Sequence, residues 1–149
     1  MRGTDHFCKY YSANLKQTID VKFAKEESPM ALYYSLPVYR DTYKLVLKIF
    51  EVTQNFSREY KYTLGQDMKR DAMQLVRSIY RANKATAKKQ EHLEEFLDCF
   101  ELLKLELRLC TDMKMLSVKK FSELSFLMDS IGKQITSWRN ASSVKSQNH

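Results

Sequence analysis

The stretch TLGQDMKRDAMQLVRSIYRANKATAKK, residues 63–89, is typical of one helix with an apolar face and a basic face. The apolar positions recur every three or four residues, as on a helix that packs against a core, and they are Leu64, Met68, Ala72, Leu75, Ile79 and Ala82. Nearly opposite them, again at helical spacing, lies a set of cations called the basic stripe, which consists of Arg70, Arg77, Arg81, Lys84 and Lys88.

The uniform sign of the basic stripe is the main indication of function. Exposed helix faces usually carry both signs, because oppositely charged pairs four residues apart stabilise a helix. Here the mixing stops after Asp71. A row of positive charge at helical pitch suits a polyanion, and nucleic acid is the commonest polyanion in a cell. The alternative is an ordinary solvated helix face.

Composition and length predict a single all-α domain. The 149 residues include three glycines and two prolines, and helix-forming residues are plentiful. No apolar run is long enough to cross a membrane, and the N-terminal residues lack the apolar region of a signal peptide. We therefore expect a cytoplasmic protein with no membrane partner. The three cysteines form no CxxC pair and are expected to stay reduced.

Four helices are expected, at residues 37–56, 63–89, 90–113 and 117–138. Their similar lengths and short connections predict an antiparallel up-and-down four-helix bundle over residues 37–139. Residues 1–36 are expected to form an N-terminal extension that is partly helical or disordered, and residues 140–149 a disordered tail.

Two of the expected helices carry more apolar surface than one bundle can bury. In helix 37–56 the stripe expected to face the core is Tyr39, Tyr43, Val46, Leu47 and Phe50, and in helix 90–113 it is Phe96, Cys99, Phe100, Leu103, Leu107 and Cys110. The second stripes are expected to form an interface in a homo-oligomer, and they are Leu45, Ile49, Val52, Phe56, Leu102, Leu105, Leu109 and Met113. Alternatively, the N-terminal segment covers this excess.

No constellation typical of an enzyme is found in the sequence. It has no P-loop, no GxGxxG and no nucleophile elbow. Its three histidines do not supply the ligands of a di-iron bundle or a histidine-rich metal site. We expect a non-enzymatic protein without a metal or cofactor. Residues 91–101 hold five acidic residues and no Lys or Arg. These acids either complement the dipole at the start of a helix or contact a basic partner.

Lys104 and Arg108 form a further basic pair, four residues apart on helix 90–113. An arginine can contact a phosphate with two hydrogen bonds, and the lysine adds a charge one turn away. Pairing with Glu101 on the same surface is the alternative. Aromatic residues are not interleaved with the cations, apart from Tyr80. Binding is therefore expected to depend on backbone charge and shape more than on base identity.

Four short motifs give the sequence a family resemblance. They are YTLG at residues 62–65, LELRL at 105–109, LS at 116–117 and IGKQITSW at 131–138. In order and spacing they resemble a small four-helix-bundle family over about residues 39–139. One branch of that family is Avd, the accessory variability determinant of diversity-generating retroelements. The other is the protein encoded within intervening sequences of bacterial 23S ribosomal RNA genes.

The resemblance implies a pentameric barrel of four-helix bundles with a positively charged surface. In the Avd branch, such a barrel binds the template RNA and the reverse transcriptase, and it has no known catalytic chemistry. Lys104 and Arg108 stand where family members carry a basic pair associated with nucleic acid and reverse transcriptase, although arginine is common at the first position. The extension before residue 37 departs from the family's usual length.

The sequence thus predicts an Avd-like, non-enzymatic accessory protein that binds RNA, or an RNA/DNA hybrid, and a reverse transcriptase. The ribosomal intervening-sequence protein is the alternative within the family. A protein–protein adaptor with an acidic partner is the alternative from another class.

Overall fold

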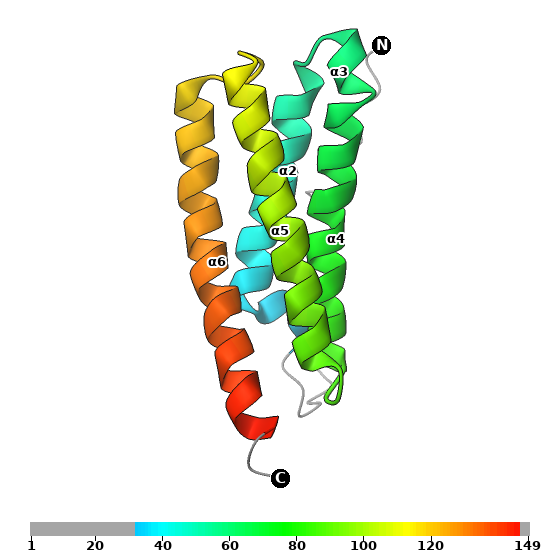
Figure 1. Cartoon of the computed structure of the whole chain (residues 1–149), viewed down its shortest axis with the longest axis vertical. Helices are drawn as coiled ribbons and strands as arrows, with labels where there is room; N and C mark the ends of the chain where they lie inside the picture. The colour runs from blue at the N-terminus through cyan, green and yellow to red at the C-terminus, as the bar shows by residue number, and fades with distance from the viewer. Residues whose placement is uncertain (1–31, 147–149) are drawn as a thin grey trace, which may run out of the picture. The chain divides into compact units, whose positions relative to one another are not determined.

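The structure, a computed structural model, describes residues 32–146, with side chains up to residue 143. Within this range the chain is all-helical, as predicted, and the four long helices lie side by side as a bundle (Figure 1). A 3-10 turn, η1 (Tyr33–Ser35), precedes the helices α2 (Pro37–Gln54), α3 (Arg58–Lys61), α4 (Leu64–Lys84), α5 (Lys89–Asp112) and α6 (Val118–Ser146). The predictions made for residues 1–31 and 147–149 lie outside the described residues.

Local chemistry explains several helix ends. Helix α2 begins at Pro37, whose fixed φ and missing N–H suit a first turn. Gly65 allows α4 to start close to α3, because a Cβ there would lie 3.2 Å from a backbone carbonyl oxygen of α3. Helix α5 ends in a Schellman turn, in which the Met115 N–H donates to the Cys110 carbonyl over 2.8 Å. Lys114 occupies the left-handed position of that turn, with φ of 58°.

Each long helix contacts two others in the described part of the chain. Helices α4 and α6 both pack against α2 and α5. Two polar contacts between α2 and α6 fix the register of these helices. Asp41, near the start of α2, accepts a hydrogen bond of 2.8 Å from Gln134, whereas Glu51, near its end, lies 3.9 Å from Lys120 in the first turn of α6.

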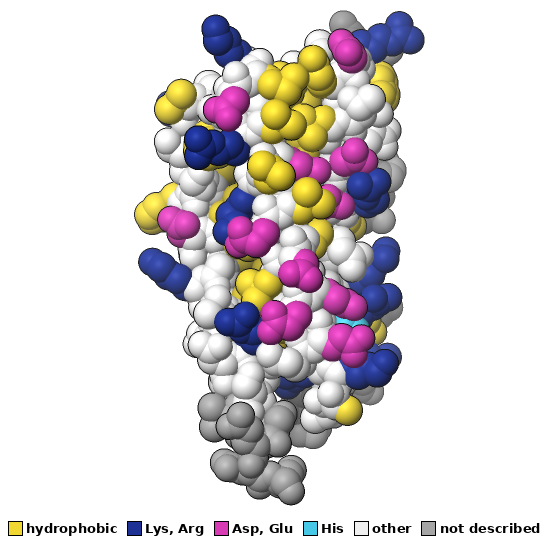
Figure 2. Space-filling view, viewed as in Figure 1, with side chains coloured by type: hydrophobic (Ala, Val, Ile, Leu, Met, Phe, Trp, Pro, Cys, Tyr) yellow, Lys and Arg dark blue, Asp and Glu magenta, His cyan; other side chains and the backbone are white. Residues whose placement is uncertain are grey.

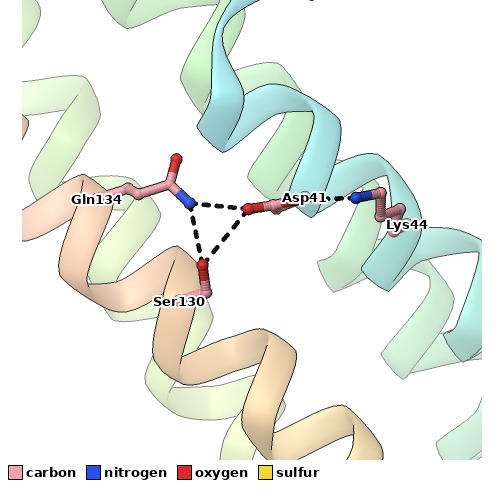
Figure 3. A network of polar contacts seen from close by, with 4 residues as sticks. All are labelled: Asp41, Lys44, Ser130 and Gln134. Atoms are coloured by element: carbon pink, nitrogen blue, oxygen red, sulfur yellow. Dashed lines mark hydrogen bonds and ion pairs between the residues drawn. The ribbon is translucent and has the colours of Figure 1, made fainter.

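A small polar network ties α2 to α6 at the first of these contacts (Figure 3). Gln134 donates to both Asp41 and the Ser130 hydroxyl, and Lys44 lies 3.2 Å from the Asp41 carboxylate. Burial raises the pKa of Asp41, but the hydrogen bonds from Gln134 and Lys44 outweigh it, so that the pKa lies below its usual range. The network therefore favours an ionised carboxylate at this contact.

The predicted core faces of α4 and α5 are confirmed. On α4, Met68, Ala72, Leu75, Ile79 and Ala82 are fully buried, and Leu64 is half-buried. On α5, Phe96, Phe100, Leu103, Leu107 and Cys110 are buried, and Cys99 is half-buried. These stripes meet along the contact between α4 and α5. Apolar periodicity alone was sufficient to identify the core face of both helices.

The prediction for α2 is wrong, because its two apolar stripes exchange roles. The residues assigned to an oligomer interface, Leu45, Ile49, Val52 and Phe56, lie in the core, none more than 6% exposed. In the stripe expected to face the core, Tyr39 and Tyr43 are half-buried, Leu47 and Phe50 are exposed, and Val46 alone is buried. The chosen stripe is free of hydroxyl groups, so it enters the core without an unsatisfied polar atom.

The joint between α4 and α5 also differs from the prediction. Helix α4 ends at Lys84, and Lys88 lies in the turn before α5 instead of on the helix expected to reach residue 89. The spacing of Ala82 and Leu93 explains why the sequence did not predict this break. They are eleven residues apart, so a continuous helix would place them within about 20° of each other, and the apolar pattern runs through the turn unbroken.

Helix α6 is longer than predicted and continues to Ser146, into the expected disordered tail. Neither glycine nor proline interrupts residues 139–146. Arg139 pairs with Glu94 of α5 over 3.5 Å, and Ser143 donates to the Gln90 side chain over 3.1 Å. These contacts with α5 hold the additional turns of α6 in the bundle.

Candidate nucleic-acid interface

The structure divides the basic stripe into paired and unpaired cations. The Arg70 guanidinium lies 2.9 Å from the Asp67 carboxylate and 3.4 Å from that of Asp71, so its charge is largely compensated. Lys88 is exposed but belongs to the turn between α4 and α5. Neither residue extends the run of free charge along α4.

The remaining members, Arg77, Arg81 and Lys84, form what we call the α4 cation row. All three are exposed, and none forms an ion pair with a carboxylate of residues 32–143. Figure 2 shows Lys and Arg side chains gathered along the edge that α4 forms. With spacings of four and three residues, the row spans about 10 Å of the helix axis. It is the part of the basic stripe that can neutralise phosphates without breaking an ion pair with a described residue.

Lys104 and Arg108 lie on the outer surface of α5 and pair with acids of the same helix. Lys104 forms an ion pair with Glu101, the alternative considered from the sequence, and its Nζ lies 5.4 Å from the Phe100 ring centroid. Arg108 lies 3.7 Å from the Asp112 carboxylate. Both pairs are exposed and therefore weak, so a phosphate could displace the acids.

Lys104 also borders an open groove of about 590 Å³ between α5 and α6. Lys133 and Asp129 line the same groove, together with the hydroxyl of Thr136. One lysine and one aspartate from α6 leave this groove with little charge of its own. It offers polar contacts but no concentration of positive charge.

A tyrosine cluster lies beside the α4 cation row, and the sequence reasoning missed it. Its members are Tyr33 of η1, Tyr39 and Tyr43 of α2, and Tyr80 of α4. The Tyr33 ring meets Tyr39 and Tyr80 edge to face, with centroids 5.2 Å apart in each case. Tyr39 and Tyr43 are nearly parallel at 6.4 Å. The tyrosines at 33, 39 and 43 are a visible signal, but only the fold brings them to Tyr80.

The exposed apolar surface of α5 matches the sequence prediction. Leu102, Leu105, Leu109 and Met113, here called the apolar strip, are between 40% and 64% exposed. Figure 2 shows hydrophobic side chains along the C-terminal half of α5, where these residues lie. Their exposure is confirmed, whereas their role as an oligomer interface stays a prediction. Of the eight proposed interface residues, these four remain candidates after the correction to α2.

Buried carboxyl groups meet where α4 packs against α5. Glu106 and Asp71 are each only 8% exposed, and each has a buried oxygen without a hydrogen-bond partner among the described residues. Burial, together with the charges of Asp71 and Asp67, raises the pKa of Glu106 to about 7, and the charge of Arg70 opposes the shift. This contact therefore holds a carboxyl that titrates near neutral pH.

Metal sites and membrane-spanning helices are absent from the described residues. No group of three or more His, Cys, Asp or Glu side chains suited to a metal ion occurs among them. None of the helices within residues 32–146 is both long and apolar enough to cross a membrane. The surface features of this part of the chain are thus the α4 cation row, the tyrosine cluster and the apolar strip.

These features define a helical bundle whose surface carries cations beside a tyrosine cluster and, on α5, an exposed apolar strip. A model of the bAvd-like family matches residues 38–142, and the chain belongs to this family. The resemblance drawn from its short motifs is thereby confirmed. No match was found among curated proteins.

Proposed function

We propose that this bAvd-like protein is a non-enzymatic accessory protein that binds RNA and a reverse transcriptase in a diversity-generating retroelement. In this role it acts in the cytoplasm as a homo-oligomer, most simply a pentamer of antiparallel four-helix bundles. Family membership supports the accessory role. The observation that carries RNA binding is the α4 cation row, whose charges are unpaired within the described residues.

The chemistry of the α4 cation row fits a nucleic-acid backbone. Arg77 and Arg81 each present a planar guanidinium that can donate two parallel hydrogen bonds to one phosphate. Lys84 contributes a compact charge that adapts to the strand. Because these contacts release counterions from the RNA, binding should weaken steeply as salt rises.

Lys104 and Arg108 have a second, separable role in this proposal. Each would exchange a carboxylate of α5 for its ligand, so each contributes less to affinity than a free cation of α4. Their place on α5, away from the α4 cation row, suits contact with the reverse transcriptase. Losing them should therefore impair capture of the polymerase more than binding of RNA.

The test is fluorescence anisotropy with a labelled single-stranded RNA at several salt concentrations. Each phosphate contact contributes about −0.7 to the slope of log affinity against log salt. We expect Arg77→Ala/Arg81→Ala to flatten the slope by about 1.4 on this basis. The matched control, Lys119→Ala/Lys133→Ala, removes two exposed charges from α6 and should change the slope little. No binding of the wild type at low salt would refute RNA binding and favour the adaptor.

The polymerase contact is tested by affinity capture with a reverse transcriptase from a diversity-generating retroelement. We expect wild type and Arg77→Ala/Arg81→Ala to retain the enzyme after nuclease treatment. Lys104→Ala/Arg108→Ala should lose most of it while keeping its helical circular dichroism spectrum. Equal capture by all three proteins would remove Lys104 and Arg108 from the polymerase contact.

The apolar strip supports the oligomer. Closed rings of five subunits use head-to-tail contacts, so the strip would meet a different surface of the next subunit. Leu105, its most exposed member at 64%, is the most sensitive position. We expect Leu105→Glu to yield monomers in light scattering after size exclusion. Gln66→Glu, which adds the same charge at an exposed polar site of α4, should leave the mass unchanged.

A further inference from the structure

Tyr80 lies within the α4 cation row. It is 42% exposed, and Arg77, Arg81 and Lys84 lie three residues before it, one after it and four after it. The Lys84 Nζ is 5.9 Å from the centroid of the Tyr80 ring. An aromatic ring and three cations thus occupy one surface, and the ring packs against Tyr33 of η1.

The other members of the tyrosine cluster extend this surface beyond Tyr80. The rings of Tyr33 and Tyr80 meet edge to face, and so do those of Tyr33 and Tyr39. Edge-to-face contacts orient rings without covering both faces of each one. Because the contact with Tyr33 covers at most one face of the Tyr80 ring, Tyr80 keeps a π-face for a flat partner. A tyrosine hydroxyl can also bond to a phosphate or base.

We propose that the tyrosine cluster stacks unpaired bases of a single-stranded RNA whose phosphates contact the α4 cation row. This inference rests on the proposed RNA binding and adds a contact with bases. Proteins hold single strands without reading their sequence by placing a row of cationic side chains beside aromatic rings. Bases in a duplex are already stacked on their neighbours, so the cluster distinguishes unpaired from paired RNA.

Lys84 links the two parts of the site. Its ammonium lies over the Tyr80 ring in the absence of RNA. A base stacking on that face would displace the flexible lysine side chain, and the displaced ammonium would reach toward the phosphate of the stacked nucleotide. The cation–π contact is therefore exchanged for a base–ring contact and a phosphate contact.

The experiment compares a single-stranded RNA with a hairpin duplex containing the same number of phosphates. Tyr80→Leu removes the ring and keeps apolar bulk, whereas Tyr80→Phe keeps the ring. We expect Tyr80→Leu to weaken single-strand binding about tenfold, as for loss of one stacked base, and duplex binding less than about twofold. Tyr80→Phe should stay close to wild type. The salt slope should be unchanged in both variants, because no phosphate contact is removed.

A tyrosine remote from the site provides the control. Tyr62 is 62% exposed and precedes α4, whose first residue lies about 24 Å along the helix axis from Tyr80. Tyr62→Leu should bind both RNAs as the wild type does. In the wild type, a 4-thiouridine in the single strand should crosslink under ultraviolet light to the peptide that contains Tyr80. This readout does not depend on how well any variant folds.

The outcomes separate this inference from the proposed function. If the wild type binds neither RNA, the proposed function fails and this inference with it. If the wild type binds RNA but crosslinks elsewhere, or if Tyr80→Leu binds the single strand with unchanged affinity, only the stacking site is refuted. Equal losses for single strand and duplex would likewise refute stacking.

Discussion

The carboxyl of Glu106 allows a quantitative test of the contact between α4 and α5. Glu106→Gln preserves the shape of the side chain and removes its titration. In the folded protein, burial raises the pKa of Glu106 from the ordinary 4.5 to about 7. The folded state therefore holds this proton more tightly than the unfolded chain does. Its stabilising contribution is complete below pH 4.5 and is lost as the pH rises through about 7.

The size of this contribution follows from the pKa shift. The difference between 4.5 and about 7 corresponds to about 3 kcal/mol of unfolding free energy, at about 1.4 kcal/mol per pKa unit. The Asp67 carboxylate, whose charge helps to raise this pKa, is half exposed, so water screens part of its contribution. We expect the wild type to lose about 1–2 kcal/mol between about pH 5 and pH 8, after this screening.

The assay is urea unfolding followed by far-ultraviolet circular dichroism, at several pH values and one protein concentration. Unfolding free energies of Glu106→Gln should fall less than those of the wild type as pH rises. Glu91→Gln, an exposed glutamate in the first turn of the same helix, should follow the wild type. Parallel pH profiles for Glu106→Gln and wild type would show that Glu106 is ionised normally, and the argument would fail.

Three further substitutions test the packing of the bundle by the same unfolding assay. Ile49→Ala should lower the unfolding free energy by about 3 kcal/mol because Ile49 is fully buried. Leu47→Ala, on the exposed stripe, should lower it by less than about 1 kcal/mol. Similar losses for the two variants would contradict the exchange of stripes. Gln134→Ala, which removes the 2.8 Å hydrogen bond to Asp41, should cost about 1 kcal/mol at neutral pH. Because the pKa of Asp41 is lowered, that loss should shrink in acid as the carboxyl becomes protonated, and a loss independent of pH would contradict the network. Lys114→Gly should stabilise the fold by about 0.5–1 kcal/mol, since glycine adopts the left-handed φ of 58° without strain; destabilisation would show that the lysine side chain matters there.

Sequence periodicity predicted the helices whose two faces differ in chemistry. Helix α4 carries apolar residues on one face and cations on the opposite face, so the sequence identified its core face without ambiguity. Helix α2 has two apolar stripes at equally good helical spacing, and periodicity cannot choose between them. The hydroxyls of Tyr39 and Tyr43 could have decided the choice, because a stripe with tyrosines needs access to water or hydrogen-bond partners.

The tyrosine cluster shows what a single-helix pattern cannot reveal. Tyr80 alone offers one ring, and its partners Tyr33 and Tyr39 lie more than forty residues earlier in the chain. They reach Tyr80 only because α2 packs against α4 and η1 contacts both helices. The spacing in the sequence shows a basic pair such as Lys104 and Arg108. It does not show whether their charges are free, because that depends on the ion pairs with Glu101 and Asp112.

The two sides of the α4 cation row constrain the path of a bound strand. Toward α5 lies the acidic block of residues 91–101, and Figure 2 shows acidic side chains gathered on that half of the helix. Glu94 and Glu101 pair with Arg139 and Lys104, but Glu91 and Asp98 are exposed on this block and would repel phosphates. Toward α2 lies the tyrosine cluster, which contains no carboxylate. Since repulsion acts over about 8 Å at physiological salt, an RNA strand held by the row is directed away from α5 and onto the tyrosines.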